Sequence, residues 1–424
     1  MSFDQYLAIP FFELDHDTIA RTLSDSPELC RLSGKFRRLF GLQSPLAPSL
    51  AFIGGEVAPE LAGANFTGEA LASLSGNGVA ISEALASCIG EGAELLSQFQ
   101  RTGDVVLTGT LADAGRRTTQ CVQDWCRAHL GEIEPAAQPS LDWVSGVRLG
   151  DGAPVLLPAD LCLRRLPHTQ TLLPRSALST GCAAGVSRET AMLRAVLELI
   201  ERDAASLWWM GGRCPRPIAL EEPAAQSGAA LLSVLRAGRS ARRSWLADVT
   251  TEFAVPCVAA LSVDNDSRGL ACGLAARMTL EEAVRAAILE MCQSELGLAV
   301  IEVKRRERGE AALNPVDRRH AARAEMLSAQ DCELLHPKGT PLPSPPLKDL
   351  AAADALAGVV ARLASVGIEV YGLDLTREDI GIPVVRAVAP GLQLFPSQLV
   401  GARLGQVIAE TGGGDPHTKG ISLL

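Results

Sequence analysis

Three stretches of the chain repeat the same spacing of apolar and polar positions. In each stretch, an alanine is followed seven residues later by a carboxylate, and three residues after that by a second carboxylate or its amide. The stretches are Ala84, Glu91 and Glu94; Ala191, Glu198 and Glu201; and Ala283, Glu290 and Gln293. Positions three apart share one face of a helix, so each stretch predicts an alanine- and leucine-rich helix with a pair of polar residues on one face.

The glutamates of the second stretch lie among apolar residues. Glu198 and Glu201 belong to AVLELIERDAASLWW, whereas a solvated helix face would be wider and more polar. Because an uncompensated buried carboxylate is very costly, we expect the three helices to converge on one cavity, with a cationic group among their carboxylates. For any single pair, an ordinary solvated helix face is the alternative.

The three stretches also begin in similar ways, which indicates an internally repeated architecture. A Gly-Val dipeptide lies six residues before Ala84 and again six residues before Ala191. Glycine-rich stretches, SGNG and STGCAAG, lead into these two helices. The third helix opens at Thr279 with T-L-E-E, a capping-box pattern that is typical of a helix start.

The rest of the apolar pattern alternates between strands and helices and predicts an α/β fold. The predicted strands are 50–55, 105–109, a hairpin of 141–149 and 153–161, 244–250, 254–264, 270–276, 368–376 and 382–390. The predicted helices are 81–99, 111–130, 187–210, 225–237, 279–308 and 349–366.

The same pattern divides the chain into three parts. Residues 1–50 look helical and are predicted to form an N-terminal extension to a main domain of residues 51–400. Within that domain, residues 338–348 contain four prolines and no periodic pattern, which predicts a surface loop. Residues 401–424 form a tail, and its last thirteen residues are expected to be flexible or ordered only by docking.

The composition is that of a globular protein without a nucleic-acid surface or a membrane span. The 424 residues are 47% apolar, 21% charged and only 4% aromatic. A formal net charge of −10 argues against sequence-independent binding to nucleic acid, which needs a basic surface. No apolar run approaches the roughly 18 residues that a membrane span needs, and the acidic N-terminus lacks the pattern of a signal peptide.

The cysteines and histidines predict reduced thiols and no zinc site. Eleven cysteines are scattered without a C-x-x-C pair, and the six histidines show no metal-ligand spacing. Cysteines in apolar stretches behave as small buried hydrophobes, so we expect reduced thiols and a cytoplasmic location. The absence of a G-x-x-x-x-G-K-[ST] motif excludes a P-loop nucleotide site.

Four motifs resemble those of the YcaO family and occur in the family's order. SGNGVAISEALASCIGEGAE and STGCAAGVSRETAMLRAVLELIERDA are similar to its two glycine-rich approaches and the E-x-x-E helices that follow them. EAVRAAILEMCQ is similar to its E-x-x-Q helix, and LDLTREDIGIPVVRAVAPGLQ to its D-L-T-R block. The resemblance covers residues 51–400 as a catalytic domain, and it implies an α/β YcaO-like fold with repeated sheet-plus-helix units around a central cavity for ATP and Mg²⁺.

The resemblance also implies residue roles. Members of the family bind ATP and Mg²⁺ and phosphorylate a peptide-backbone amide oxygen, which requires metal-neutralised phosphates and accurate positioning. Mg²⁺ prefers carboxylate oxygen and water as ligands. The implied catalytic residues are Glu198, Glu201 and Arg202. The implied nucleotide-binding residues are Ser87, Glu91, Glu94, Glu290, Gln293 and Arg386, and the implied Mg²⁺ ligands are Glu91, Glu94, Glu198, Glu201 and Glu290.

Four positions depart from the family pattern. Asn77 stands where many members have lysine, and Leu95 stands where they have arginine. Val186 and Thr190 replace an asparagine and a glutamate that are common in the family. The chain also ends in KGISLL, not in the proline-rich tail of many cyclodehydratases. The loss of one carboxylate and two cations would weaken ATP binding or favour a scaffolding role.

The sequence therefore predicts an ATP- and Mg²⁺-dependent enzyme that activates backbone amides of a ribosomally made precursor peptide. Azoline formation from Cys, Ser or Thr is the leading reaction, and these residues do not distinguish it from thioamide or amidine formation. The alternative is a non-catalytic, accessory subunit of a peptide-modifying complex.

The expected partners follow from the same resemblance. Residues 1–50 are too few for a separate leader-binding domain of roughly 80 residues. We therefore expect a leader-binding partner that resembles ubiquitin-activating proteins and docks partly on residues 411–424. A flavin dehydrogenase and a second copy of this chain are further candidate partners.

Overall fold

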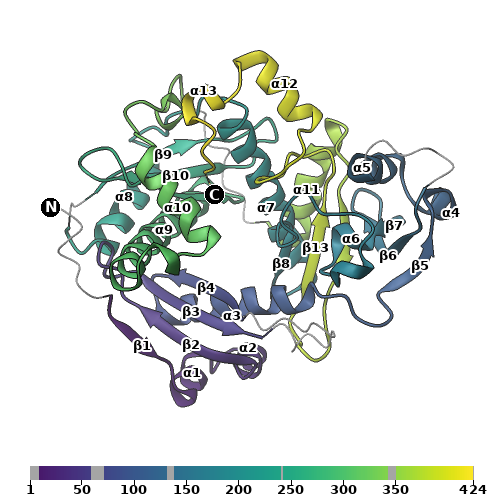
Figure 1. The fold of residues 1–424 in the computed structure, drawn as a ribbon, viewed down its shortest axis with the longest axis horizontal. Helices are drawn as coiled ribbons and strands as arrows, with labels where there is room; N and C mark the ends of the chain where they lie inside the picture. The colour runs from purple at the N-terminus through teal and green to yellow at the C-terminus, as the bar shows by residue number, and fades with distance from the viewer. Residues whose placement is uncertain (1–8, 59–70, 131–137, 240–241, 342–349, 424) are drawn as a thin grey trace.

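The computed structural model describes residues 9–58, 71–130, 138–239, 242–341 and 350–423 of the chain. Its described residues form three sheets with helices packed against them, placed around the centre of the molecule (Figure 1). The N-terminal sheet has the order β1-β2-β3-β4, and the middle sheet has the order β11-β10-β9. The third sheet has the order β5-β6-β12-β13-β8, with β7 beside β6. The predicted mixed α/β fold is therefore confirmed.

The N-terminal sheet is antiparallel and carries the first of the three glutamate helices. Strand β4 is followed directly by helix α3, which packs against β3 and β4. The elements of this part are β1 (Phe11–Glu13), α1 (His16–Thr22), α2 (Pro27–Ser33), β2 (Phe36–Leu42), β3 (Ala51–Val57), β4 (Ala72–Gly78) and α3 (Ile81–Ser97).

The prediction that residues 1–50 are helical is wrong for part of the described segment. Two short helices are present, but residues 36–42 form strand β2, in which Leu39 and Gly41 are buried and Arg38 is exposed. Burial that alternates with a period of two is the signature of a strand. Because β2 pairs with β3, this segment shares its sheet with residues beyond position 50.

The third sheet carries the second glutamate helix, α7, and the hairpin predicted around residues 150–152 is present as β6 and β7. The single helix predicted at 111–130 is instead two helices, because Gly115 adopts a φ of 51° and ends the first one. The elements are β5 (Val105–Gly109), α4 (Leu111–Ala114), α5 (Gln120–Leu130), β6 (Leu141–Arg148), β7 (Pro154–Pro158), α6 (Ala159–Cys162), β8 (Cys182–Ala184), α7 (Arg188–Trp209), α11 (Ala352–Ser365), β12 (Tyr371–Asp374) and β13 (Val384–Val388).

The middle sheet carries the third glutamate helix, α9. Strands β10 and β11 are buried along their whole length, and α9 packs across both. Thr279 caps α9 as predicted, since its hydroxyl accepts a hydrogen bond from the backbone N–H of Glu282 at 3.2 Å. The elements are α8 (Pro223–Leu235), β9 (Arg243–Asp248), β10 (Cys257–Val263), β11 (Ala271–Ala276), α9 (Leu280–Arg308) and α10 (Pro315–Met326).

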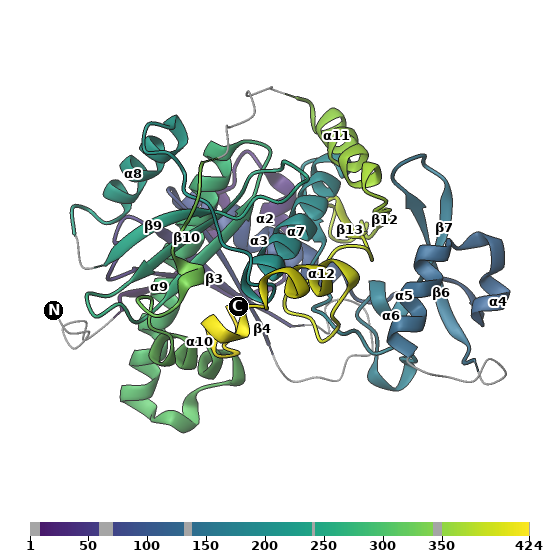
Figure 2. The same ribbon diagram turned by 90° about the horizontal axis from the view of Figure 1, so that it is seen from above.

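The C-terminal segment is ordered by packing against the rest of the chain. Helix α12 (Ala402–Thr411) lies against α7, and the short helix α13 (Asp415–Thr418) follows it (Figure 2). The indole N–H of Trp209 donates a hydrogen bond to the carbonyl of Ile421 at 2.7 Å, and Leu423 is fully buried. Docking, the second of the two predicted states of this tail, is the one observed. The prediction of a proline-rich loop falls mostly on residues 342–349, which lie outside the described residues.

The sequence pattern did not reveal strands β4 and β8, whose glycines and alanines resemble a loop. The small residues are needed because a helix backbone lies against the strand. A Cβ atom at Gly76 of β4 would lie 2.1 Å from the carbonyl oxygen of Ala84 and 2.4 Å from the backbone nitrogen of Cys88, both in α3. Gly273 of β11 lies equally close to α9. Helices α3 and α9 are therefore pressed against the strands that precede them.

Candidate active site

The first glutamate of each helix is held by the strand segment that precedes that helix. Glu91 accepts a hydrogen bond from the backbone N–H of Ser75 at 3.0 Å. Glu198 accepts one from Gly181 at 2.9 Å, and Glu290 accepts one from Leu274 at 3.1 Å. The side chain turns back to a residue 16 or 17 positions earlier in all three cases: Ser75 and Leu274 lie in strands, and Gly181 directly precedes β8. These bonds fix one oxygen of each carboxylate.

The second polar residue of each helix reaches the next sheet. Glu94 of α3 accepts a hydrogen bond from the backbone N–H of Ala184 in β8 at 2.8 Å. Glu201 of α7 accepts one from Ala276 in β11 at 3.0 Å. Gln293 of α9 donates to the hydroxyl of Ser75 in β4 at 3.1 Å. The contacts run from α3 to β8, from α7 to β11 and from α9 to β4, so the three helix and strand pairs are linked in a closed ring.

Burial makes this ring of acidic groups hold protons more tightly than usual. It raises the pKa of Glu91 and Glu290 to about 7 and that of Glu94 to about 8. Burial also raises the pKa of Glu198, although Arg202 opposes the shift. Glu91 retains exposed surface, Glu94, Glu198 and Glu290 are half-buried, and Glu201 is buried. A cation placed among these groups would lower their pKa values and displace their protons.

Arg202 is the cation that the chain itself brings to the ring. Its guanidinium lies 3.6 Å from Glu198 and 3.6 Å from Glu201. Burial lowers the pKa of this guanidinium, but the attraction of Glu201 and Glu198 more than offsets that effect, so the pKa is raised. Arg202 therefore neutralises part of the charge of α7. Glu91 and Glu94 of α3 have no ion pair within the described ranges.

The donor set suits a magnesium ion that is shared with phosphate oxygens. Within the described residues, no group of three or more His, Cys, Asp or Glu side chains forms a metal cage by itself. Mg²⁺ keeps several waters and is commonly bound by one or two carboxylates together with substrate phosphates. Glu91, Glu94 and Glu290 each use one oxygen for a backbone N–H, which leaves the other oxygen for such an ion; the second oxygen of Glu198 lies 3.6 Å from Arg202.

The remaining predicted site residues lie on the same elements. Ser87 is exposed on α3, one turn before Glu91. Arg386 of β13 is buried, with 4% of its surface exposed, and its guanidinium donates to the carbonyl of Leu178. The Nε atom of Arg386 has no hydrogen-bond partner among the described residues. A buried guanidinium with an unused donor is suited to bind an anion.

The four positions that depart from the family pattern have different surroundings. Asn77 donates its side-chain amide to Gln293 and thereby takes part in the link between α9 and β4. Thr190 lies in the first turn of α7, where its backbone N–H is capped by Ser187. Leu95 packs at the edge of the apolar core, and Val186 is 91% exposed. Asn77 is thus the one substituted position that contacts the ring.

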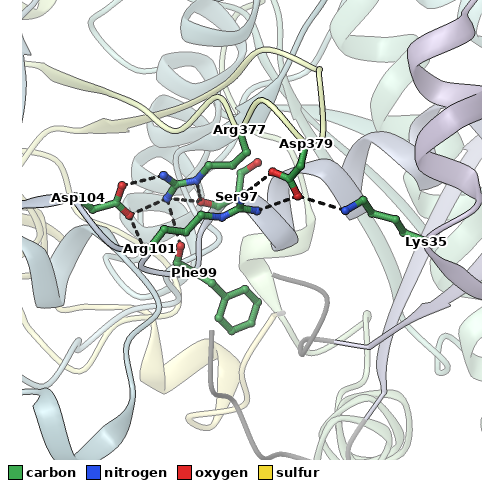
Figure 3. A network of polar contacts seen from close by, with 7 residues as sticks. All are labelled: Lys35, Ser97, Phe99, Arg101, Asp104, Arg377 and Asp379. Carbon is green, nitrogen blue, oxygen red and sulfur yellow. Dashed lines mark hydrogen bonds and ion pairs between the residues drawn. The ribbon is translucent and has the colours of Figure 1, made fainter. Parts of the chain in front are cut away.

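A polar network outside the ring holds the C-terminal end of α3 (Figure 3). Arg377, in the loop between β12 and β13, donates to the carbonyls of Ser97 and Phe99 at 3.1 Å and to Asp104 at 2.7 Å. It therefore satisfies carbonyls at the end of the helix that carries Glu91 and Glu94. The arginine of the LDLTR motif is structural, a role that the motif alone did not indicate. The complete network comprises Lys35, Ser97, Phe99, Arg101, Asp104, Arg377 and Asp379.

Asp203, directly after Arg202, joins α7 to the C-terminal helix. The fully buried Asp203 carboxylate accepts hydrogen bonds from Arg403 of α12 at 3.1 and 2.8 Å. A cavity of about 240 Å³ lies beside this pair and contains none of the predicted site residues; its lining is Leu207, Arg213, Glu252, Arg403, Gln406 and Val407.

No described helix has both the length and the apolar character that crossing a membrane would require.

Comparisons with known proteins point to one family. The model of the family described as YcaO cyclodehydratase, ATP- and Mg²⁺-binding, matches residues 75–393, well over half of the chain. An uncharacterised protein of Methanothermobacter thermautotrophicus is 28% identical over 265 residues, which are 60% of this chain and 66% of that protein. The chain therefore spans slightly less than two thirds of this curated relative.

Solved structures share the fold at low sequence identity. A heterocyclase in complex with substrate and cofactor matches with a TM-score of 0.72 and 23% identity, over 93% of this chain and 55% of the heterocyclase. YcaO from Methanopyrus kandleri, bound with AMPPCP and Mg²⁺, matches with a TM-score of 0.59 and 20% identity, over 90% and 91% of the two chains. The E. coli microcin synthetase McbBCD complex with pro-MccB17 bound matches with a TM-score of 0.62 and 15% identity, over 84% and 88%.

Proposed function

The chain belongs to the YcaO family, which binds ATP and Mg²⁺, and from this premise we propose that it activates backbone amides of a ribosomally made precursor peptide. The proposed step is O-phosphorylation of an amide oxygen, with azoline-forming cyclodehydration of Cys, Ser or Thr as the outcome. The observation that carries the proposal is the closed ring of Glu91, Glu94, Glu198, Glu201 and Glu290, in which burial raises most of the carboxyl pKa values.

The residues of the ring would divide the work of holding Mg²⁺-ATP. The carboxylates of Glu91, Glu94, Glu198, Glu201 and Glu290 are the proposed magnesium ligands, because the ion favours hard oxygen donors. At Glu198 and Glu201 the ion would share the carboxylate with Arg202. Arg202 and Arg386 are proposed to contact phosphate oxygens, with Ser87 and Gln293 as neutral hydrogen-bonding partners. Bound ATP would supply the phosphoryl group that turns an amide oxygen into a leaving group.

The geometry of the site favours a mechanism in which the side chains position the reactants, not one in which a side chain reacts covalently. Backbone N–H groups of β4, β11 and the segment before β8 fix one oxygen of three glutamates, which limits the movement of their free oxygens. Glu198, Glu201 and Arg202 are the proposed catalytic residues because they combine two carboxylates and a cation within one helical turn. Phosphoryl transfer depends on such positioning and on charge neutralisation.

A peptide substrate and a partner protein are part of the proposal. The similar heterocyclase was solved with substrate, and the similar McbBCD complex with pro-MccB17. We propose a leader-binding partner that resembles ubiquitin-activating proteins and docks on the outer surface of residues 411–424; a flavin dehydrogenase and a second copy of this chain are further partners. The test is leader-peptide binding by the chain alone and with its partner, in the wild type and in Lys419→Gln, which lies exposed in this segment. Tight leader binding by the isolated chain would contradict this part.

A non-catalytic accessory subunit is the second candidate function. Asn77 favours this function because it stands where many family members have a lysine. Its side-chain amide carries no charge and donates its hydrogen bond to Gln293. Val186, at a position where the family often has asparagine, is 91% exposed and brings no polar group to the ring. An accessory subunit would keep the fold and the partner surface without turning over ATP.

Titration calorimetry with Mg²⁺-ATP separates the two functions. The wild type is expected to bind, and Glu198→Gln and Glu201→Gln are expected to lose at least about tenfold in affinity, the equivalent of about 1.4 kcal/mol. Glu302→Gln, a half-buried position on α9 whose carboxylate pairs with Arg305 and not with the ring, is the matched control and should bind like the wild type. No ATP binding by folded wild type with its partner and peptide present would exclude the enzyme. Unchanged ATP hydrolysis in both ring variants would make these glutamates structural.

A further inference from the structure

Two consecutive arginines after α6 differ in the partners that they have. Arg165 is buried and forms ion pairs with Asp160 and Asp142. Arg164 uses its Nε–H for the side-chain oxygen of Gln98 at 2.8 Å and forms no ion pair with any described residue. Arg165 is therefore a neutralised structural cation, whereas Arg164 is a half-buried cation without a counter-ion.

Arg386 is a second cation without a counter-ion. It is 4% exposed, forms no ion pair within the described ranges, and leaves its Nε–H unbonded. Its strand, β13, pairs with β8, and Arg386 lies directly opposite Cys182 in that pairing. The backbone N–H that binds Glu94 belongs to Ala184, two residues further along β8. Arg386 therefore adjoins the acidic ring.

The two arginines are brought together by the same small group of side chains. Gln98, which accepts the hydrogen bond of Arg164, is 2% exposed and also contacts the thiol of Cys182. Cys182 in turn faces Arg386 across the strand pair. The two cations repel each other. Burial is the largest cause of the lowered pKa of Arg164, and the charge of Arg386 is the second largest.

No described carboxylate forms an ion pair with either arginine, although the charge of Arg386 lowers the pKa of Glu198 in the ring. Burial raises the pKa of the Cys182 thiol, so the thiol is neutral at physiological pH. Two adjacent cations removed from water without an anion are costly, and proteins tolerate such an arrangement where a ligand supplies the anion.

We propose that Arg164 and Arg386 form an oxyanion subsite for the terminal phosphate of the nucleotide, beside the carboxylates that hold its magnesium ion. The proposal deepens the proposed function and rests on it, and its new element is Arg164. Guanidinium groups bind phosphate through two parallel hydrogen bonds, and both side chains have N–H donors that no described residue uses. A phosphate group between them would provide the missing negative charge.

The test compares Arg164→Gln and Arg386→Gln with the wild type and with Arg127→Gln, an exposed arginine on α5 that pairs with Asp124. Titration calorimetry measures Mg²⁺-ATP and Mg²⁺-ADP binding, and thermal unfolding is followed with and without inorganic phosphate. Loss of a charge-assisted hydrogen bond is expected to weaken ATP binding by about tenfold or more. ADP binding should stay within about twofold, since ADP lacks the terminal phosphate.

Thermal unfolding distinguishes a phosphate ligand from a structural role. Without ligand, Arg164→Gln should melt at the same temperature as the wild type or higher, because an uncompensated cation has been removed. Inorganic phosphate should raise the melting temperature of the wild type and of Arg127→Gln but not that of the two subsite variants. A lower melting temperature of ligand-free Arg164→Gln with unchanged ATP affinity would overturn the proposal, as would equal weakening of ATP and ADP.

Further outcomes keep the test decisive. If Arg164→Gln does not fold, Arg164→Lys keeps the charge and loses the two-point contact, so it should still bind ATP about tenfold more weakly. Wild-type affinity in Arg164→Lys would count against the subsite. If the wild type binds no Mg²⁺-ATP, the proposed nucleotide function is wrong. The anion subsite is then also wrong if inorganic phosphate leaves the melting temperature of the wild type unchanged.

Discussion

Two of the glutamates on helix α9, Glu290 and Glu295, lie five positions apart and have opposite electrostatic surroundings. Glu295 is completely buried and fully paired: Arg236 binds its two oxygens at 2.7 and 3.2 Å, and Arg242 lies 3.3 Å away. The hydroxyl of Ser262 also donates to Glu295. Glu290 has one backbone N–H at 3.1 Å and no ion pair among the described residues, and burial raises its pKa to about 7.

The difference shows how the same residue type serves structure or function. Glu295 is surrounded by cations and donors from α8 and the middle sheet, so its charge is satisfied without a ligand. Glu290 faces Glu201 and Arg202, where the nearby carboxylates compete for one arginine. Its charge is incompletely satisfied, which is what a cation-binding site requires before its ligand arrives.

Glu295, Arg236, Arg242 and Ser262 form the paired cluster, and breaking it is expected to have the largest effect. Glu295→Gln removes the negative charge between Arg236 and Arg242 and leaves two buried cations without a counter-ion. Loss of one partner of a buried ion pair costs about 3–5 kcal/mol in the free energy of unfolding. Urea unfolding of the variant measures this change, with Glu302→Gln as the control on the same helix. A change below about 1 kcal/mol would show that Glu295 is not the structural member of the comparison.

In the ligand-free protein, Glu94 of the acidic ring is expected to make the stability of the fold depend on pH. The folded-state pKa of Glu94, about 8, lies above its ordinary value of 4.5, so the folded state binds this proton more tightly than the unfolded chain does. The contribution to stability is therefore complete below pH 4.5 and is lost as the pH rises through about 8.

Thermal unfolding between pH 5 and 8 checks this pH dependence. Glu94→Gln should match the wild type at low pH and exceed it at pH 8 by a few kcal/mol, at roughly 1.4 kcal/mol per pKa unit. Mg²⁺-ATP should reduce the difference by stabilising the ionised carboxylate. The same pH slope in Glu94→Gln and in the wild type would remove Glu94 from the group of unsatisfied residues.

A smaller effect is expected from a neutral member of the paired cluster. Ser262→Ala removes one hydrogen bond to Glu295 but leaves both arginines in place. A hydrogen bond to a charged group contributes about 1.5–3 kcal/mol, so Ser262→Ala should destabilise the fold less than Glu295→Gln does. Urea unfolding of both single variants and the double variant gives the coupling energy. Additive effects of the two substitutions would mean that the hydroxyl acts independently of the ion pairs.

Much of the fold was readable from local patterns, and the failures have identifiable causes. The helices α3, α7 and α9, which run for 17, 22 and 29 residues, were predicted from the repeated spacing of alanine and carboxylate positions. Strand β4 was missed because small residues, required at Gly76 by the close approach of α3, erase the apolar alternation. Strand β8 was missed because it has only three residues, Cys182–Ala184. Strand β2 was missed because its exposed arginines and half-buried aromatic residues do not form a clean pattern.

The candidate site was predicted in its residues but not in its connections. The shared spacing of Glu91, Glu94, Glu198, Glu201 and Glu290 is enough to mark them as a group. Nothing in the spacing indicated that Glu94 reaches β8, that Glu201 reaches β11 or that Asn77 bonds to Gln293. The sequence marked Arg164 only as half of a basic pair with Arg165, and it did not indicate which of the two has a structural role.

The sequence by itself determined the three glutamate helices, because helix periodicity and apolar faces are set by residues within a few turns of one another. Its spacing marked Glu290, but it did not indicate that Glu295, five residues later among apolar residues of the same helix, has its charge fully paired. Tertiary structure decided that difference. The arginines that satisfy Glu295 come from positions 236 and 242, more than fifty residues away. Only the packing of α8 and the middle sheet against α9 brings them close to one glutamate and not the other.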